Sequence, residues 1–549
     1  MTQPLYLLAV DLGTTALKTC LYEVGDRLTL RASASHLLTL ETDADGRAEQ
    51  DPEQWWEALI ASVPEVLASA GRSPQDVAGL SFCSQMQCLV LVDEAGLAVR
   101  PAVSYLDSRA TQRRRALTAG GPRVEGIGLA LLLPWLSVAG GVAASAKDPL
   151  WKYLRVADEE PDRFARVHRW LDAKDFLTAR CTGRFTMSHD SAFATFLADT
   201  RPRGARGIEW SPWLVRRFGV RPQHLPEIVR PEERVGSLSS AAARSLGLPE
   251  GLPVFAGGGD ASLIGVGSGA TEVGSTHVYV GTSGWVSTVS DRRLVDTKTM
   301  MATVPGAVPG RFAYFGEQET SGKCLEWVRD HLALDEIGVY LGARERASGP
   351  DQEHLSLLDY LTSTILEVPA GSGGVLFAPW LHGSRSPFED PHVRGMFFNV
   401  GLGTGKRQLI RAVVEGLAYN KRWLLEAQAR KVVPSPVLRF AGGGALSEAT
   451  GQILADVTGR VVEAVADPQN AGAAGAVLVA AWGLGLFPTL DSAAATVQVR
   501  ARFEPNLENR AVYDRNYSVF LELYSANAPL FRRLNAPGAG TASQETKSV

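Results

Sequence analysis

The sequence predicts an α/β fold made of two large lobes with a cleft between them, for three reasons. At 549 residues, the chain is longer than one hydrophobic core supports. Near the N-terminus, β-like apolar runs are followed by alternating helical and β-like segments. A similar order restarts near Pro253. We place the lobe boundary in the region 246–252, where glycine and proline interrupt the periodicity.

The first lobe, residues 1–248, opens with three strands joined by tight turns. Their apolar runs are 5–10, 17–22 and 28–40, which predict consecutive antiparallel strands. A helix is predicted to start at Pro52, because Asp51 provides an acidic cap and Trp55 and later apolar residues follow at helical spacing. Strands are then predicted at 77–82 and 89–92.

An uncharged segment at 126–146 is long enough to span a bilayer. Its four glycines and the central Pro134 make a poor isolated helix, so we expect a buried or partly covered loop and helix. Membrane contact is the alternative that this segment leaves open.

The second lobe, residues 249–490, begins with a predicted strand at 253–256, a GGGD turn and a helix-like stretch. A further strand is expected at 277–280. A helical extension at 491–536 and a disordered tail at 537–549 complete the chain, because the last residues are small and polar. Helices are also expected at 326–332, 406–430, 447–457 and 471–484.

The composition excludes several classes of protein. A formal charge of -4 argues against a nucleic-acid-binding surface. The five cysteines are odd in number and form no Cys-x-x-Cys pair, so neither a disulfide framework nor a zinc site is expected. Polar, acidic sequence begins at Asp11, too soon for a signal peptide. We therefore expect a cytoplasmic protein.

The turn that begins at Asp11 is the first candidate nucleotide site. Backbone amides and the hydroxyls of Thr14 and Thr15 can bind phosphate oxygens, Gly13 permits close approach, and Lys18 follows closely. Asp11 at the strand end can hold Mg²⁺ directly or through water. The alternative is a purely structural turn.

Two more glycine-rich turns follow predicted strands. Gly281 and Thr282 begin a GTSG turn that can form a matching hairpin on the other side of the phosphates. In the later turn, Gly443 and Gly444 would let a flat purine lie against the backbone, with Ser447 at the following helix. The order of the three turns favours a nucleotide site over three unrelated structural turns.

Asp260 ends the GGGD turn and precedes a helix of small residues. The positive end of the helix dipole should keep this carboxylate ionised, so it can accept a proton from an attacking alcohol. The alternative is that Asp260 only caps the helix.

Two other nucleotide motifs fail. The stretch from Gly401 resembles a Walker loop, but Val400 occupies the place of its first glycine and Arg407 that of the required Ser or Thr. Gly265 and Gly267 lack the third glycine of a dinucleotide site, so an oxidoreductase of the Rossmann type is not supported.

Nine blocks in order resemble the FGGY family of carbohydrate kinases, most closely its xylulokinase branch, over roughly residues 5–490. The resemblance implies two ribonuclease-H-like lobes of the actin and hexokinase ATPase fold, a sugar in the cleft, ATP with Mg²⁺, and Asp260 as catalytic base. The blocks are DLGTT from Asp11, DPEQWW from Asp51, SQM from Ser84, AKD from Ala173, GGGD from Gly257, GTSG from Gly281, APWLHGSRSPFEDPHVRGMFF from Ala378, EGLAY from Glu415 and AGGGALSE from Ala441.

The resemblance also implies sugar contacts from Met86, Gln87, Asp107 and Asp260. Xylulokinases usually carry His and two Asn residues where this chain has Gln87, Leu106 and Ala261, so several hydroxyl-binding side chains differ. The Arg-Glu pair of glycerol kinases is replaced by Met86 and Gln87, which disfavours glycerol.

A pentulose such as D-xylulose is therefore the first substrate expected, and another ketose, a deoxy sugar or a polyol is the alternative. A regulator that binds sugar or nucleotide without catalysis is a further alternative, although the presence of both Asp11 and Asp260 favours an enzyme. An ATPase or chaperone on the same fold lacks a recognisable peptide-binding segment. The sequence leaves a monomer and a homodimer both open.

Overall fold

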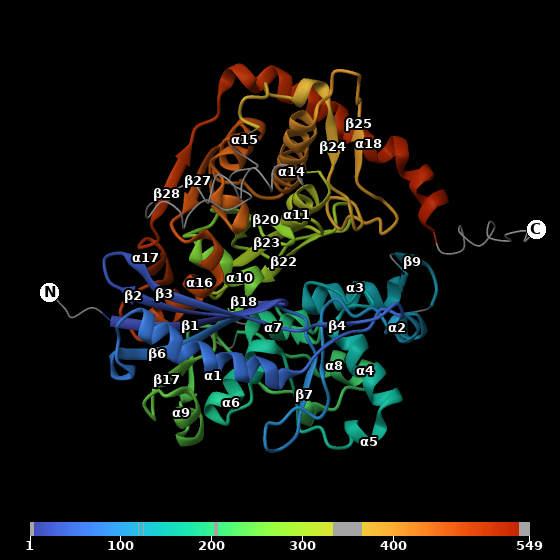
Figure 1. Ribbon diagram of the computed structural model, residues 1–549. Coiled ribbons are helices and arrows are strands. Elements are labelled where there is room, and N and C mark those ends of the chain that lie inside the picture. Colours follow the sequence, from blue (N-terminus) through green and yellow to red (C-terminus); the bar gives the residue numbers. More distant parts are fainter. Residues whose placement is uncertain (1–4, 119, 125, 202–206, 333–364, 537–549) are drawn as a thin grey trace, which may run out of the picture.

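The computed structural model describes residues 5–118, 120–124, 126–201, 207–332 and 365–536. Two lobes lie one above the other in Figure 1, with the first half of the chain in the lower lobe. The predicted tail at 537–549 lies outside the described residues.

A mixed sheet forms the centre of the first lobe. Strands β1 and β2 pair antiparallel, β2 pairs antiparallel with β3, and β1 pairs in parallel with β6. The order across the sheet is β16-β17-β6-β1-β2-β3, with β18 also paired to β6. The strand bounds are β1 Leu5–Leu12, β2 Ala16–Val24, β3 Leu28–Leu37, β6 Val77–Ser84, β16 Arg234–Ser237, β17 Pro253–Phe255 and β18 Gly258–Gly259. The predicted antiparallel start of the lobe is confirmed.

Helices cover both faces of this sheet. Helix α1 (Pro52–Ser69) begins as predicted, because Pro52 is its first residue and the Asp51 side chain accepts a hydrogen bond from the Glu53 amide. Trp55 of α1 packs edge-on against Phe176 of α6 (Ala173–Thr182) within the core on one face. Helix α16 (Ala471–Gly483) contacts β1, β2 and β6 on the other face.

A second core in the first lobe lies away from the main sheet. It contains helices α3 (Leu129–Ala139), α4 (Pro149–Glu159) and α8 (Pro212–Phe218), with Trp135, Trp151 and Phe218 in mutual contact. The uncharged segment 126–146 contributes to this core and forms a short strand followed by α3. Trp135 is fully buried whereas Leu133 is 62% exposed, so the expectation of a partly covered loop and helix is confirmed.

The sheet of the second lobe repeats the connectivity of the first. Strands β19, β20 and β23 are consecutive antiparallel neighbours, and β26 and β27 continue in parallel from β19. The strand bounds are β19 Thr276–Val280, β20 Gly284–Ser290, β21 Val295–Asp296, β22 Met301–Pro305, β23 Phe312–Gln318, β26 Val437–Ala441, β27 Val461–Val465 and β28 Val499–Phe503. Two copies of one topology thus form the molecule.

Three helices pack over the second sheet. They are α11 (Gly322–His331), α14 (Lys406–Gln428) and α15 (Glu448–Thr458), each close to its predicted position. Helix α18 (Arg510–Asn535) crosses the outside of α14 and α15, and Tyr513 and Phe520 fix it in the core. The predicted purely helical extension is wrong in one respect, because β28 joins the edge of the sheet beside β27.

Helices α10 (Asp260–Gly267) and α16 connect the two lobes. They cross in close contact between the sheets (Figure 1). A Cβ atom on Gly267 would lie 2.7 Å from the amide nitrogen of Gly475, so glycine is required for this approach. The start of α10 is thereby fixed at the interface of the lobes, which places Asp260 there.

The predicted boundary within 246–252 is wrong. Strand β17 pairs in parallel with β6, so Pro253–Phe255 completes the first sheet instead of opening the second. The repeated order of elements starts at β19. The remaining elements are short and lie mainly in connections: β4 Glu41–Thr42, β5 Ala48–Gln50, β7 Val90–Val92, β8 Ala102–Val103, α2 Thr111–Thr118, β9 Arg123–Val124, β10 Ile127–Gly128, α5 Pro161–Phe164, β11 Arg169–Leu171, β12 Thr186–Ser188, α7 His189–Ala194, β13 Ala198–Asp199, β14 Glu209–Trp210, β15 Glu227–Val229, α9 Ser240–Leu246, β24 Leu376–Ala378, β25 Met396–Phe398 and α17 Leu490–Ala494.

Candidate active site

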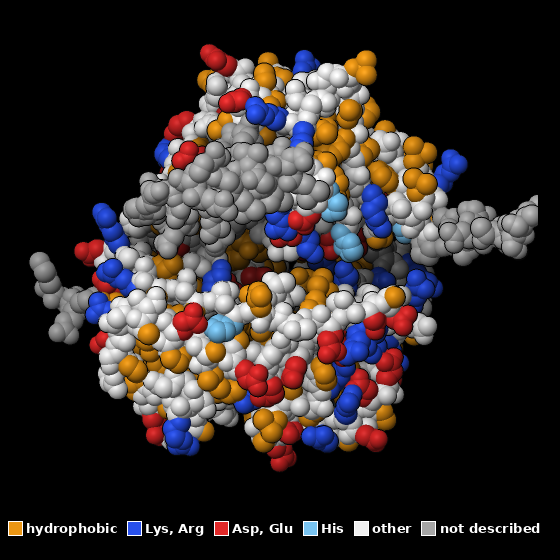
Figure 2. Space-filling view, in the orientation of Figure 1, with side chains coloured by type: hydrophobic (Ala, Val, Ile, Leu, Met, Phe, Trp, Pro, Cys, Tyr) orange, Lys and Arg blue, Asp and Glu red, His pale blue; other side chains and the backbone are white. Residues whose placement is uncertain are grey.

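The surface is hollowed between the two lobes (Figure 2). The three predicted nucleotide turns follow strands of the two sheets. The first is the hairpin turn between β1 and β2. The Gly13 amide donates to the Ala16 carbonyl at 2.9 Å, which closes the turn. Within the described part of the chain, the amides of Thr14 and Thr15 have no recorded partner, and Thr15 is exposed. This turn therefore presents free donors, as a phosphate site requires.

Asp11 and Lys18 lie opposite each other on the same hairpin. Burial raises the pKa of Asp11, while the Lys18 charge and a hydrogen bond with Cys83 oppose this shift. The ammonium of Lys18 donates to the Gln469 carbonyl at 2.8 Å, so it reaches across to the second lobe. Lys18 therefore links the two sides of the cleft.

The second turn, Gly281–Gly284, joins β19 to β20 and lies against the start of α11. Its Gly281 and Thr282 carbonyls accept hydrogen bonds from the α11 side. The amides of Thr282 and Ser283 have no recorded partner in the described residues, and Thr282 is exposed. The second turn thus resembles the first in its free donors.

The third turn follows β26 as a short 3-10 helix, Gly443–Leu446. A Cβ atom on Gly444 would lie 2.5 Å from Val280, the last residue of β19, so the second and third turns are neighbours. The Ser447 hydroxyl caps α15 by accepting from the Thr450 amide at 3.2 Å. Its side chain is thus engaged in local structure.

Asp260 is the first residue of α10, and Gly259 is the cap. Burial raises the pKa of Asp260 to about 8, and the Asp11 charge adds to the shift. The expectation that the helix dipole keeps this carboxylate ionised is therefore wrong for the ligand-free chain, because desolvation and a like charge outweigh the dipole. A cation near the two carboxylates would restore the ionised form.

Met86 and Gln87 follow β6 and lie beside the GGGD turn. The Met86 side chain packs against Gly259, directly before Asp260. Gln87 has a positive φ of 64°, its amide donates to Asp172 at 3.2 Å, and its carbonyl accepts from Lys152 at 3.1 Å. These bonds hold the Gln87 backbone in a conformation that glutamine rarely adopts. The structure thus places Met86, one of the predicted sugar residues, beside the residue that precedes Asp260.

Asp107 is placed differently from the prediction. It is fully buried, accepts from the Ala48 amide at 3.0 Å, and forms an ion pair with Arg109 at 2.6 Å. These contacts occupy its carboxylate inside the lobe. Tyr105, two residues earlier, is closer to the first turn, because its hydroxyl lies 3.5 Å from that of Thr14.

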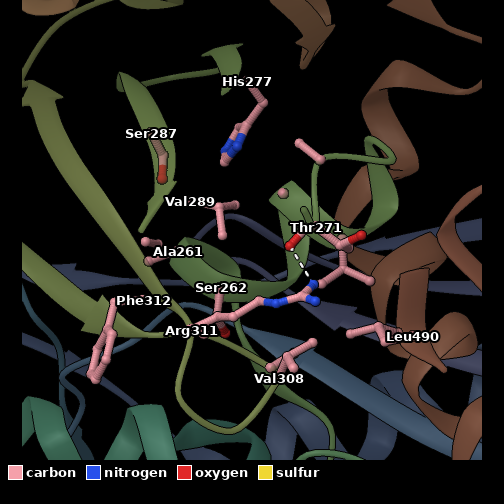
Figure 3. A pocket seen from close by; sticks show the side chains of 16 residues that line it. Ala261, Ser262, Thr271, His277, Ser287, Val289, Val308, Arg311, Phe312 and Leu490 are labelled. Atoms are coloured by element: carbon pink, nitrogen blue, oxygen red, sulfur yellow. Dashed lines mark hydrogen bonds between the residues drawn. The ribbon is translucent and has the colours of Figure 1, made fainter. Parts of the chain in front are cut away.

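A small cavity of about 30 Å³ lies behind α10 (Figure 3). Ala261, Ser262 and His277 are among its lining residues, and Arg311 donates to the Thr271 carbonyl at 2.9 Å at its edge. This volume holds about one water molecule and is too small for a sugar.

The comparisons with known proteins agree with this geometry. Family models match in two parts: the N-terminal domain of the FGGY family of carbohydrate kinases at residues 6–267, and the C-terminal domain at residues 277–484. The chain belongs to the FGGY family of carbohydrate kinases. As a member, it is a phosphotransferase that acts on a sugar, and the family uses ATP as donor.

Three relatives illustrate the similarity. The chain is 28% identical to a xylulose kinase of Staphylococcus epidermidis over 95% of this chain and 97% of that protein. It is 27% identical to a ribulokinase of Mycolicibacterium smegmatis over 99% and 98% of the two chains. A solved structure of xylulose kinase from Rhodospirillum rubrum superposes with a TM-score of 0.77 at 26% identity, covering 96% of this chain and all of that one.

Three charged residues of this carbohydrate kinase were missed from the sequence. The guanidinium of Arg385 donates to Glu317 at 2.6 Å in the second lobe, and its charge opposes the rise in pKa of Asp148 in the first. Burial raises the pKa of Asp148 to about 6, and Gln87 donates to it at 3.4 Å. Arg385 lies in the block from Ala378, which entered only as part of the family resemblance. No local sequence pattern indicates that Arg385 and Asp148 lie near each other.

In the part of the chain that the structure describes, no helix is long and apolar enough to cross a membrane.

Proposed function

We propose that this kinase phosphorylates a pentulose, with D-xylulose as the first candidate, at the expense of ATP. The observation that carries the proposal is the position of Asp260: it directly follows Gly259, against which Met86 packs, and it lies near enough to Asp11 for that charge to raise its pKa. Relatives named xylulose kinase and ribulokinase support a five-carbon ketose.

The three turns would hold the nucleotide. The amides of Thr14, Thr15 and Thr282, which have no partner among the described residues, suit phosphate oxygens, and Gly281 would allow close approach. Gly443 and Gly444 would lie against the purine, and Ser447 would act by fixing the start of α15 beneath them. Lys18 would hold the first and third turns together through Gln469.

The donor set fits Mg²⁺. Within the described residues, no group of three or more His, Cys, Asp or Glu side chains could hold a metal by itself. Magnesium in kinases is bound through one or two carboxylates together with substrate phosphates, and Asp11 at the first turn supplies such a carboxylate. When bound, Mg²⁺ would neutralise phosphate charge during transfer.

Phosphoryl transfer would then proceed in one step. The sugar hydroxyl oxygen forms a bond to the γ-phosphorus, the bond from that phosphorus to the bridging oxygen breaks, and ADP leaves. Asp260 accepts the hydroxyl proton. Because burial and Asp11 raise the pKa of Asp260 to about 8, cationic charge at Asp11 is needed to keep Asp260 ionised at neutral pH.

Met86 and Gln87 would bind the sugar, with Asp148 as a further polar contact. Asp107 would act indirectly, through Arg109 and the loop that carries Tyr105. Leu106 and Ala261 offer no hydrogen bonds to hydroxyls, so a less polar ketose or a deoxy sugar is a natural competitor of D-xylulose.

The five cysteines are buried as free thiols, which fits a reducing compartment such as the cytoplasm.

An ADP-release assay against a panel of ketoses, aldoses and polyols tests the proposal. D-xylulose or another pentulose should give the highest kcat/KM, and product analysis should show one phosphate ester. A higher kcat/KM for an aldose or glycerol, or no ADP release with any sugar, would contradict it.

A further inference from the structure

Helix α14 carries a lysine that is buried without a partner. Lys421 is 1% exposed, and its ammonium nitrogen has no hydrogen-bond acceptor among the residues that the structure describes. Ser321, at the start of α11, is fully buried, and its hydroxyl likewise has no recorded partner in this part of the chain. The Lys421 ammonium and the Ser321 hydroxyl, which belong to different elements, thus both lack a hydrogen-bond partner among the described residues.

Both groups converge on the second turn. A Cβ atom on Gly284 would lie 2.6 Å from the Lys421 nitrogen and 2.6 Å from the Ser321 hydroxyl. Glycine is therefore required at this position, and the lysine nitrogen lies directly beneath the turn.

The turn itself is fixed from the same side. The Gly281 carbonyl accepts from the Gly322 amide at 2.6 Å, and the Thr282 carbonyl accepts from the Ser321 and Lys323 amides at 3.2 and 3.3 Å. Its carbonyls are thus occupied by α11, whereas the amides of Thr282 and Ser283 have no recorded partner in the described chain. Unpaired amide N–H groups close to the Lys421 ammonium favour the binding of an anion at this turn.

An unpaired, buried amine in this position destabilises the folded state of the ligand-free protein. Burial lowers the pKa of Lys421 to about 7, although the nearby Cys324 and Glu317 oppose this shift. Lys152 shows how a buried lysine is usually stabilised. It is also fully buried, but its ammonium donates hydrogen bonds to the carbonyls of Gln87 and Ser104. Among the described residues, no acceptor satisfies Lys421 in this way.

We propose that Lys421 is a positioning residue for the phosphates of ATP. Its ammonium supplies the positive counter-charge beneath the Gly281–Gly284 turn. The inference rests on the proposed function, because that function places the phosphates at this turn. Anionic phosphate above the turn offsets the buried ammonium, and the ammonium in turn strengthens phosphate binding. Ser321 assists by donating toward the same point.

The test is Lys421→Met, with ATP binding measured calorimetrically in the absence of sugar. The Kd for ATP should rise about tenfold or more, which corresponds to about 1.4 kcal/mol. The ligand-free Tm should stay the same or rise, because an unsatisfied buried amine is replaced by an apolar chain of similar length. In steady state, KM for ATP should rise more than kcat falls. Ser321→Ala should show a smaller change in the same direction.

Lys152→Met is the matched control, because it removes a buried lysine whose hydrogen bonds are satisfied. It should lower Tm and leave the ATP Kd within about twofold. A Lys421→Met protein that binds ATP as the wild type does, or that loses Tm or fails to fold, overturns the inference, since the amine would then be inert or merely structural. Failure of the wild type to bind ATP would instead contradict the proposed function, and the inference with it.

Discussion

At the scale of single residues, Asp260 is a carboxyl group that folding makes harder to ionise. The pKa of Asp260 is about 8 in the folded chain against 3.8 in a model peptide, first because of burial and second because of Asp11. The folded state therefore holds a proton that the unfolded state has released between these pH values. Stability from this site is lost progressively as pH rises from about 4 to 8.

Asp260→Asn should consequently stabilise the ligand-free protein. Asparagine keeps the acceptor for the Ala261 amide, which donates to Asp260 at 2.8 Å, but carries no charge to desolvate. The Tm of the variant should exceed that of the wild type by at least about 2 °C at pH 7. The difference should shrink toward pH 4. Thermal unfolding across this pH range measures it, and a constant or negative difference would refute the charge-based explanation.

Gln87 is the residue that most directly tests the sugar side. Its side chain reaches Asp148, and its backbone is already fixed by Asp172 and Lys152. Gln87→Ala should raise KM for the best sugar about tenfold, the cost of one or two hydrogen bonds, and leave KM for ATP near its starting value. Steady-state kinetics with each substrate varied gives both values. Equal changes in the two constants, or none in either, would remove Gln87 from the site.

Asp260, Gln87 and Asp11 could be proposed from the sequence because each stands in a local motif. Glu317 and Arg385 could not, since they are 68 residues apart in sequence and the approach of Arg385 to Asp148 depends on how the two lobes meet. The raised pKa of Asp260 was missed for the same reason. It depends on burial and on a carboxylate about 250 residues away in sequence, which a helix-dipole argument does not include.

At the scale of elements, the three glycine-rich turns were predictable because strand, turn and following segment are adjacent in sequence. The lobe boundary was not, since an apolar strand such as Pro253–Phe255 carries no local mark of the sheet that it joins. β28 was missed because it is an edge strand in which Arg500 and Arg502 interrupt the apolar residues and none of the five residues is buried. The close contact of α10 with α16 also depends on glycines that the sequence shows only as small residues.

At the scale of the whole molecule, bonds across the cleft hold the lobes together in the ligand-free chain. Arg293 of the second lobe donates to the carbonyls of Ser137 and Val138 at 2.8 and 3.1 Å and to the Thr200 hydroxyl at 2.9 Å. Because water must be excluded during phosphoryl transfer, ligands should strengthen this closed arrangement.

Arg293→Ala should therefore open the ligand-free molecule more than the ligand-bound one. Small-angle scattering should show a larger radius of gyration for the variant without ligands, and equal radii for variant and wild type with sugar and a non-hydrolysable ATP analogue. Identical radii in all four samples, with binding confirmed independently, would mean that neither Arg293 nor the ligands control closure.

The rate of sugar phosphorylation by Asp260→Asn tests the central claim most directly, because the claim separates binding from proton transfer. In the variant, kcat for the best pentulose should fall by about 10² to 10⁴, the usual contribution of a general base, while the Kd for ATP changes little. The structure excludes Asp260 as the N-cap, because Gly259 occupies that position. The remaining alternative, a purely structural Asp260 at the start of α10, predicts an active variant, since asparagine keeps the hydrogen bond from the Ala261 amide. A folded Asp260→Asn protein that binds ATP and retains more than about a tenth of the parental kcat would contradict the account.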